Sequence, residues 1–67
     1  MLDEILLEIR RVFCGRVLFQ MENGYTRVVL GEIVDDYMRS RLEGKLNLIA
    51  SEYESHVLLE DLMIRKV

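Results

Sequence analysis

Two short apolar runs separated by an Asn-Gly pair constrain the fold of this chain more than any other feature of its sequence. The runs span residues 16–21 and 25–30 and are rich in valine, leucine and aromatic side chains. Asn23 and Gly24 lie between them, and both residue types tolerate the positive φ that a tight primed turn requires. The pattern therefore predicts a β-hairpin.

The first of these strands has no cleanly polar face. Alternation places Val17, Phe19 and Met21 on one side, which we expect to face the core. The opposite side would carry Arg16, Leu18 and Gln20. Since Leu18 interrupts the polar side, we expect another element or another subunit to cover it.

Helical spacing appears on both sides of the hairpin. Six apolar residues in the N-terminal segment recur at this spacing: Leu2, Ile5, Leu6, Ile9, Val12 and Phe13. Asp3 is placed to cap the start of this first helix and Gly15 to follow its end. Residues 32–43 show a second helical stripe, and Gly44 stands where a helix-terminating glycine is common.

An internal repeat bears on the C-terminal third. Residues 15–32 align without a gap on residues 44–61, 29 positions later, and share a glycine, a valine and a leucine. Repeats of this kind indicate one supersecondary unit used twice. The repeat predicts a second hairpin with strands at 45–50 and 55–62, which gives an α+β fold of order α-β-β-α-β-β.

Periodicity alone leaves a second interpretation open for the same segment. Leu46, Ile49 and Ala50 form an acceptable helical stripe, and Ser51 with Glu54 fits a capping box. The alternative fold is α-β-β-α-α, with a helical C-terminal third.

Length and composition predict a single small domain, residues 1–67, that needs a partner. The chain has 67 residues, 51% of them hydrophobic, with one cysteine and one histidine. Chains this short bury only about 60% of the surface that the unfolded form exposes, and small chains often rely on disulfides, metals or oligomerisation. Because one cysteine and one histidine cannot build a disulfide or a zinc site within one chain, we expect a homo-oligomer, a dimer or larger.

Charge and hydropathy limit the compartments and ligands that we expect. The net charge of −3 argues against a dedicated nucleic-acid binder, and no segment has the apolar length of a signal peptide or a membrane span. We therefore expect a soluble, cytoplasmic protein without a membrane partner, with Cys14 reduced.

No set of residues predicts catalysis. Glu52, His56 and Glu60 would share a helix face only in the alternative fold, and are better explained as a solvated polar face. Cys14 lies at the end of a predicted helix, where the dipole disfavours a thiolate. We expect no catalytic residue, no metal site and no cofactor, so the protein is predicted not to be an enzyme.

One surface has the composition of a contact site, in which arginines alternate with aromatic side chains. Such a combination can neutralise phosphates and stack bases, or contact a protein partner. Its predicted contact residues are Arg10, Arg11, Arg16, Arg27 and Tyr25, with Phe13 and Phe19 as the other aromatic residues of the strip.

Residues 44–61 also resemble a known motif. The segment opens with Gly-Lys-Leu and closes with His-Val-Leu-Leu-Glu-Asp, which is similar to the first signature motif of Sm-like proteins. That resemblance implies an N-terminal helix, a small bent barrel, rings and RNA binding. His56 replaces the motif's asparagine, the spacing is two residues longer, and the second motif's Arg-Gly pair is absent, so membership is not inferred.

Together these features predict a small non-catalytic interaction or regulatory protein that homo-oligomerises and binds a protein partner. The alternative is an oligomeric RNA- or DNA-binding protein, of Sm-like or transcriptional regulator type, that uses the arginine and aromatic strip.

Overall fold

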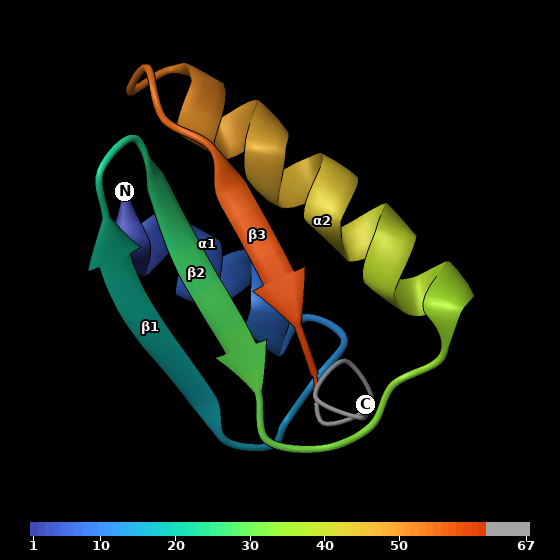
Figure 1. Cartoon of the computed structure of the whole chain (residues 1–67). Coiled ribbons are helices and arrows are strands. Elements are labelled where there is room, and N and C mark those ends of the chain that lie inside the picture. The colour runs from blue at the N-terminus through green and yellow to red at the C-terminus, as the bar shows by residue number, and fades with distance from the viewer. Residues whose placement is uncertain (62–67) are drawn as a thin grey trace.

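The computed structural model describes residues 1–61 and shows a small α+β fold of order α-β-β-α-β (Figure 1). Its elements are α1 (Leu2–Arg10), β1 (Val17–Glu22), β2 (Tyr25–Leu30), α2 (Asp36–Ser51) and β3 (Val57–Glu60). The three strands form one sheet in the order β1-β2-β3. The mixed class and the first three elements were predicted correctly from the sequence.

The predicted hairpin is present. Strands β1 and β2 are antiparallel, with Leu18 opposite Val29 and Glu22 opposite Tyr25. Gly24 has a φ of 83°, a conformation that glycine adopts without steric cost. The Asn-Gly pair therefore forms the hairpin turn that the sequence predicted, and this turn sets the register of the two strands.

Strand β3 joins the other side of β2 in parallel, with Val28 opposite Leu59. A parallel neighbour requires a crossover connection, and α2 supplies it by returning the chain to the starting end of the sheet. Strand β2 is therefore central, while β1 and β3 form the two edges.

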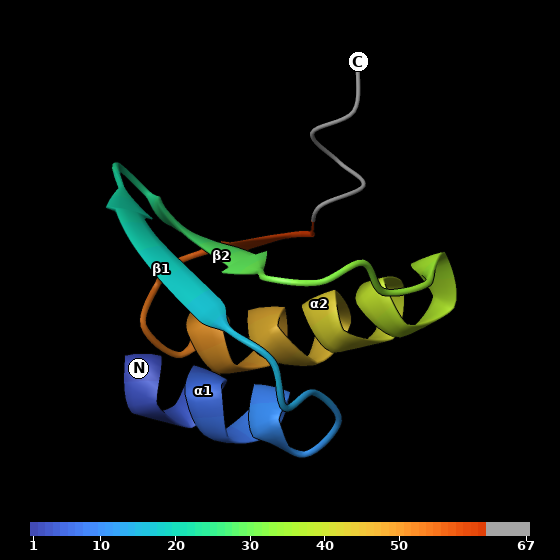
Figure 2. The same ribbon diagram turned by 90° about the horizontal axis from the view of Figure 1, so that it is seen from below.

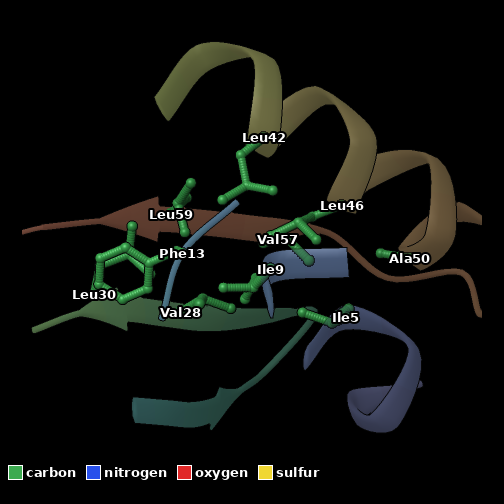
Figure 3. Close-up of a cluster of buried hydrophobic side chains, with 10 residues drawn as sticks. All are labelled: Ile5, Ile9, Phe13, Val28, Leu30, Leu42, Leu46, Ala50, Val57 and Leu59. Carbon is green, nitrogen blue, oxygen red and sulfur yellow. The ribbon is translucent and has the colours of Figure 1, made fainter. Parts of the chain in front are cut away.

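Both helices lie on the same face of the sheet (Figure 2). Alternate residues of β2, namely Thr26, Val28 and Leu30, are fully buried against them. Figure 3 shows the core side chains that fill the space between the layers. The buried apolar residues are Ile5, Ile9, Phe13, Val28, Leu30, Leu42, Leu46, Ala50, Val57 and Leu59.

Helix α1 is shorter than its apolar spacing predicts. It ends at Arg10, the N-cap position is Met1 with no side-chain cap, and Asp3 lies within the first turn. Phe13 still reaches the core after the helix has ended. Gly15 makes this packing feasible, because a Cβ there would lie 2.7 Å from the Phe13 ring.

Helix α2 corrects the predicted second hairpin. The helix begins at Asp36, where the Asp35 side chain caps it, and continues through Gly44 and residues 45–50 to Ser51. A Cβ on Gly44 would have no neighbour within 4 Å, so this glycine costs only helix propensity, about 1 kcal/mol. The buried residues Leu42, Leu46 and Ala50 form one stripe that continues past Gly44, so packing against the core extends the helix beyond the glycine.

The α-β-β-α-α alternative is confirmed for residues 45–51, which are helical, but they belong to α2 and the helix does not continue beyond Ser51. The chain turns through Glu54, whose φ is 55°, and then forms β3. The predicted strand at 55–62 is confirmed for Val57–Glu60, while residue 62 lies outside the described residues. The fold therefore contains no repeat of the helix and hairpin unit.

The sequence similarity behind the predicted repeat has a simpler origin. The repeat aligned Val28 with Val57 and Leu30 with Leu59, and all four side chains are buried. They belong to neighbouring strands that turn the same face toward the same core. Two strands under one packing constraint therefore resemble each other without sharing a structural unit.

Candidate interaction surface

The β3 edge of the sheet is closed by side chains of α2. The Val57 amide donates to Asn47 Oδ1 at 2.8 Å, and Asn47 Nδ2 donates to the Val57 carbonyl at 3.1 Å. The Leu59 amide donates to Glu43 Oε2 at 2.9 Å. These are the backbone groups that point away from β2, so α2 acts in place of a fourth strand (Figure 1).

The residue spacings of α2 and β3 explain why two side chains of the helix are enough to close the β3 edge. Glu43 and Asn47 lie one turn apart on the same helix face, a rise of about 6 Å. Val57 and Leu59 are two residues apart on the strand, about 6.6 Å. The two periods match closely, so both polar side chains reach the backbone groups of the strand edge.

The β1 edge has no such cover. The Gly31 amide donates to the Arg16 carbonyl at 2.7 Å. This bond shows which alternate residues of β1 direct their backbone groups toward β2. The even-numbered residues of β1 therefore bond to β2, and the N–H and C=O groups of Val17, Phe19 and Met21 point outward. Within residues 1–61, no backbone hydrogen bond reaches these outward groups from another element.

The sheet face opposite the helices carries several apolar side chains. Leu18 is 56% exposed, and Val29 and Leu58 are half-buried. Beside them, Arg27 Nη1 lies 3.1 Å from Glu60 Oε2. No helix or strand of the described part of the chain lies over this face (Figure 2).

Arg27 is held on that outer face by two partners. Its Nη2 donates to the Tyr25 hydroxyl at 3.4 Å, and its ion pair with Glu60 joins β2 to β3. The hydrogen bond to Tyr25 and the nearby Glu60 carboxylate raise the pKa of Arg27 above its ordinary value. Arg27 therefore remains a cation with a fixed position.

The structure divides the predicted arginine strip between two faces of the sheet. Tyr25 and Arg27 lie together on the outer face, and Arg16 follows the same alternation. Arg10 and Arg11 lie at the end of α1, on the helix side. Arg10 donates to the Gly15 carbonyl at 2.6 Å, and Arg11 pairs with Glu8 at 3.5 Å.

The aromatic residues of that strip are mostly unavailable for stacking. Phe13 is only 6% exposed and belongs to the core. Phe19 and Tyr25 are half-buried. The predicted contact residues thus do not form one continuous surface, although Arg16, Arg27 and Tyr25 share a face.

Three polar residues that organise the fold were not predicted from the sequence. Asn47 and Glu43 close the β3 edge, and their spacing of four beside the buried stripe of α2 was the available signal. Asp61 is only 1% exposed. Its Oδ2 accepts from the Val34 amide at 2.8 Å, which ties the loop before α2 to the end of β3.

The residues considered for metal or thiol chemistry are dispersed. Helix α2 ends before Glu52, so Glu52, His56 and Glu60 do not share a helix face. Among residues 1–61, no group of three or more His, Cys, Asp or Glu side chains is arranged to hold a metal ion. Cys14 is exposed and unpaired.

A groove of about 310 Å³ lies on the helix side, between the end of α1 and the start of α2. Its lining includes the apolar side chains of Val12, Met38 and Leu42. Arg41 stacks over Tyr37 with 5.5 Å between the guanidinium and the ring centre. Charged side chains also line the groove, namely Glu8, Asp35, Arg41 and Lys45.

Comparison with protein-family models, curated proteins and solved structures finds no match to this chain. The structure contradicts the Sm-like resemblance, because Gly44 to Leu46 lie inside α2 and not in a strand. No helix among residues 1–61 is long and apolar enough to cross a bilayer.

Proposed function

We propose that this protein is a small non-catalytic interaction protein that homo-oligomerises and binds a protein partner as an adaptor or regulator. The observation that supports it most is the contrast between the two sheet edges. The β3 edge is closed by Asn47 and Glu43, whereas the outward groups of β1 have no partner within the described residues.

An open edge is a template for pairing with another strand. Monomeric proteins shield such edges with lysine, proline, bulges or a covering element. Strand β1 reads VLFQME and contains neither lysine nor proline. An edge of this composition favours association with a second chain.

The outer face supplies the second part of the proposal. Leu18, Val29 and Leu58 form an apolar centre on the sheet, and the Arg27–Glu60 pair lies beside it. Protein interfaces combine an apolar centre with a polar surround. This face is therefore the surface that we assign to a protein partner.

The oligomer is tested by blocking the edge without disturbing the hairpin. The Met21 amide points away from β2, so Met21→Pro removes an outward donor and leaves the hairpin ladder intact. Met21→Ala removes the same side chain and keeps the amide. We expect the unmodified chain to sediment as an oligomer, Met21→Ala to sediment as a weaker oligomer that keeps the outward amide, and Met21→Pro to sediment as a monomer with an unchanged circular dichroism spectrum.

Two results would count against the proposal. A monomeric unmodified chain at high micromolar concentration would remove the oligomer altogether. Equal masses for Met21→Pro and Met21→Ala would place the interface somewhere other than the β1 edge.

The nucleic-acid alternative rests on Arg16, Arg27 and Tyr25, which share the outer face. It predicts binding to single-stranded RNA or DNA that weakens steeply with salt. Loss of that binding in Arg27→Gln, with the oligomer unchanged, would favour it over a protein partner. Absence of binding at low salt would exclude it.

A further inference from the structure

We propose that two copies of this chain pair through β1 in antiparallel fashion, with Phe19 on the twofold axis. This inference rests on the proposed homo-oligomer and specifies its register. A continuous sheet formed by two identical edges requires a twofold axis perpendicular to the sheet, which makes the paired strands antiparallel. The two sheets of three strands then become one sheet of six.

The alternation of inward and outward backbone groups along β1 limits the registers in which two β1 strands can pair. The outward groups belong to Val17, Phe19 and Met21, so only registers that pair odd-numbered residues form hydrogen bonds. With the axis at Phe19, Val17 lies opposite the partner's Met21, and Phe19 opposite the partner's Phe19. All three outward residues are then used on both strands.

On the helix side, this register joins apolar side chains. Val17 and Phe19 are half-buried, and Met21 is 62% exposed although it lies on the face that packs against the helices. Their exposure comes from the open edge. Pairing Val17 with the partner's Met21, and the two Phe19 side chains with each other, extends each core into the other.

On the outer face, the same register joins opposite charges. Arg16 directly precedes β1 and Glu22 is its last residue, and both side chains are exposed. With the axis at Phe19, Arg16 lies opposite the partner's Glu22, and the symmetry repeats the pair. Between these charges, Leu18 lies opposite the partner's Gln20.

Neighbouring registers lose this complementarity. Moving the axis to Leu18 leaves Arg16 opposite the partner's Gln20. Moving it to Gln20 places Glu22 opposite the partner's Leu18. Each shift also leaves one outward residue of β1 without a partner residue in the strand, so the Phe19 register satisfies both the backbone and the charges.

Charge reversal tests the outer face. Arg16→Glu places like charges opposite each other twice, and we expect it to raise the dimer dissociation constant about tenfold. Glu22→Arg should have a similar effect, and the double reversal R16E/E22R should restore the parent value. Arg41→Glu, on α2, is the control for net charge and should leave the constant unchanged. Failure of the double reversal to restore affinity would overturn the pairing of charges.

Cross-linking tests the register directly, in a Cys14→Ser background under mild oxidation. Leu18 and the partner's Gln20 would form a pair with Cα atoms about 4.5 Å apart, within the range that a disulfide spans. We expect an equimolar mixture of Leu18→Cys and Gln20→Cys chains to form a mixed disulfide dimer. Each variant alone should remain unlinked.

The other outcomes are equally decisive. Efficient self-linking of Leu18→Cys or of Gln20→Cys would place the axis at that residue and overturn the Phe19 register. An oligomer that links in none of these mixtures would show that β1 does not pair in this way, while the proposed homo-oligomer would stand. A monomer at all concentrations would overturn both.

Discussion

Asn47 and Val57 exchange two hydrogen bonds, at 2.8 Å and 3.1 Å, in the way that two residues of adjacent strands do. The side chain of a helix thus pairs with the backbone of an edge strand. This relationship makes β3 a closed edge. It also leaves β1 as the edge at which a further strand can join.

Asn47→Ala should therefore destabilise the fold by about 1–3 kcal/mol, because it leaves the amide and carbonyl of the buried Val57 without partners. Urea unfolding followed by circular dichroism measures the change. Leu48→Ala, on an adjacent residue that is 72% exposed, is the matched control and should change the free energy of unfolding by less than about 0.5 kcal/mol. Equal effects of the two variants would show that the Asn47 hydrogen bonds contribute nothing.

Gly15→Ala should be destabilising by about 1–3 kcal/mol, because the new Cβ would lie 2.7 Å from the Phe13 ring and would displace it from the core. Thermal unfolding would show the loss as a lower Tm. If the substitution is neutral, the Phe13 ring has room to move and Gly15 is not required for its packing.

Gly44→Ala should have the opposite sign. Nothing lies within 4 Å of a Cβ at this position, and α2 is helical there, so alanine should stabilise the protein by about 0.5–1 kcal/mol. The same unfolding experiment measures this increase in the free energy of unfolding. A destabilising effect would argue that α2 is interrupted at Gly44, as the sequence alone had suggested.

These two glycines show why local pattern predicted only part of the fold. A glycine after a helical stripe is typical of a helix end, and Gly15 follows α1 while Gly44 does not follow α2. The difference lies in tertiary packing, because Leu46 and Ala50 continue the buried stripe beyond Gly44. The hairpin was predictable since Asn23 and Gly24 set its turn locally.

The candidate interaction surface was harder to predict from the sequence than the hairpin. Leu18 on the otherwise polar side of the first strand predicted a face covered by another element or subunit, but the sequence does not say which strand of the hairpin becomes central. That depends on β3 pairing with β2, across the length of α2. For the same reason the role of Asn47 could not be inferred, since its partner Val57 lies beyond the end of the helix.

A pH titration tests the contact between α1 and the turn after α2. The Tyr53 hydroxyl donates to Glu4 Oε1, and this hydrogen bond, with the Glu4 charge, raises the pKa of Tyr53. A pKa raised in the folded state means that the contact stabilises the fold below the ordinary tyrosine pKa and is lost as the pH rises through the folded value. NMR titration of the Tyr53 ring should show the raised pKa, and Glu4→Gln should lower it toward normal.

If Glu4→Gln leaves the titration of Tyr53 unchanged, the hydrogen bond does not persist in solution. Because both side chains are largely exposed, we expect the effect on overall stability to be small. The titration of Tyr53 is therefore a more sensitive measure than unfolding.

Amide hydrogen exchange at Phe19 shows directly whether the β1 edge pairs with a second copy of the chain. In a monomer, the amides of Leu18 and Gln20 are protected by β2, whereas the Phe19 amide faces solvent and should exchange rapidly. If β1 pairs with a second copy, protection of the Phe19 amide should rise with protein concentration, in parallel with the fraction of oligomer. Rapid exchange of the Phe19 amide at every concentration, alongside protected Leu18 and Gln20, would contradict the claim that the β1 edge is the interface.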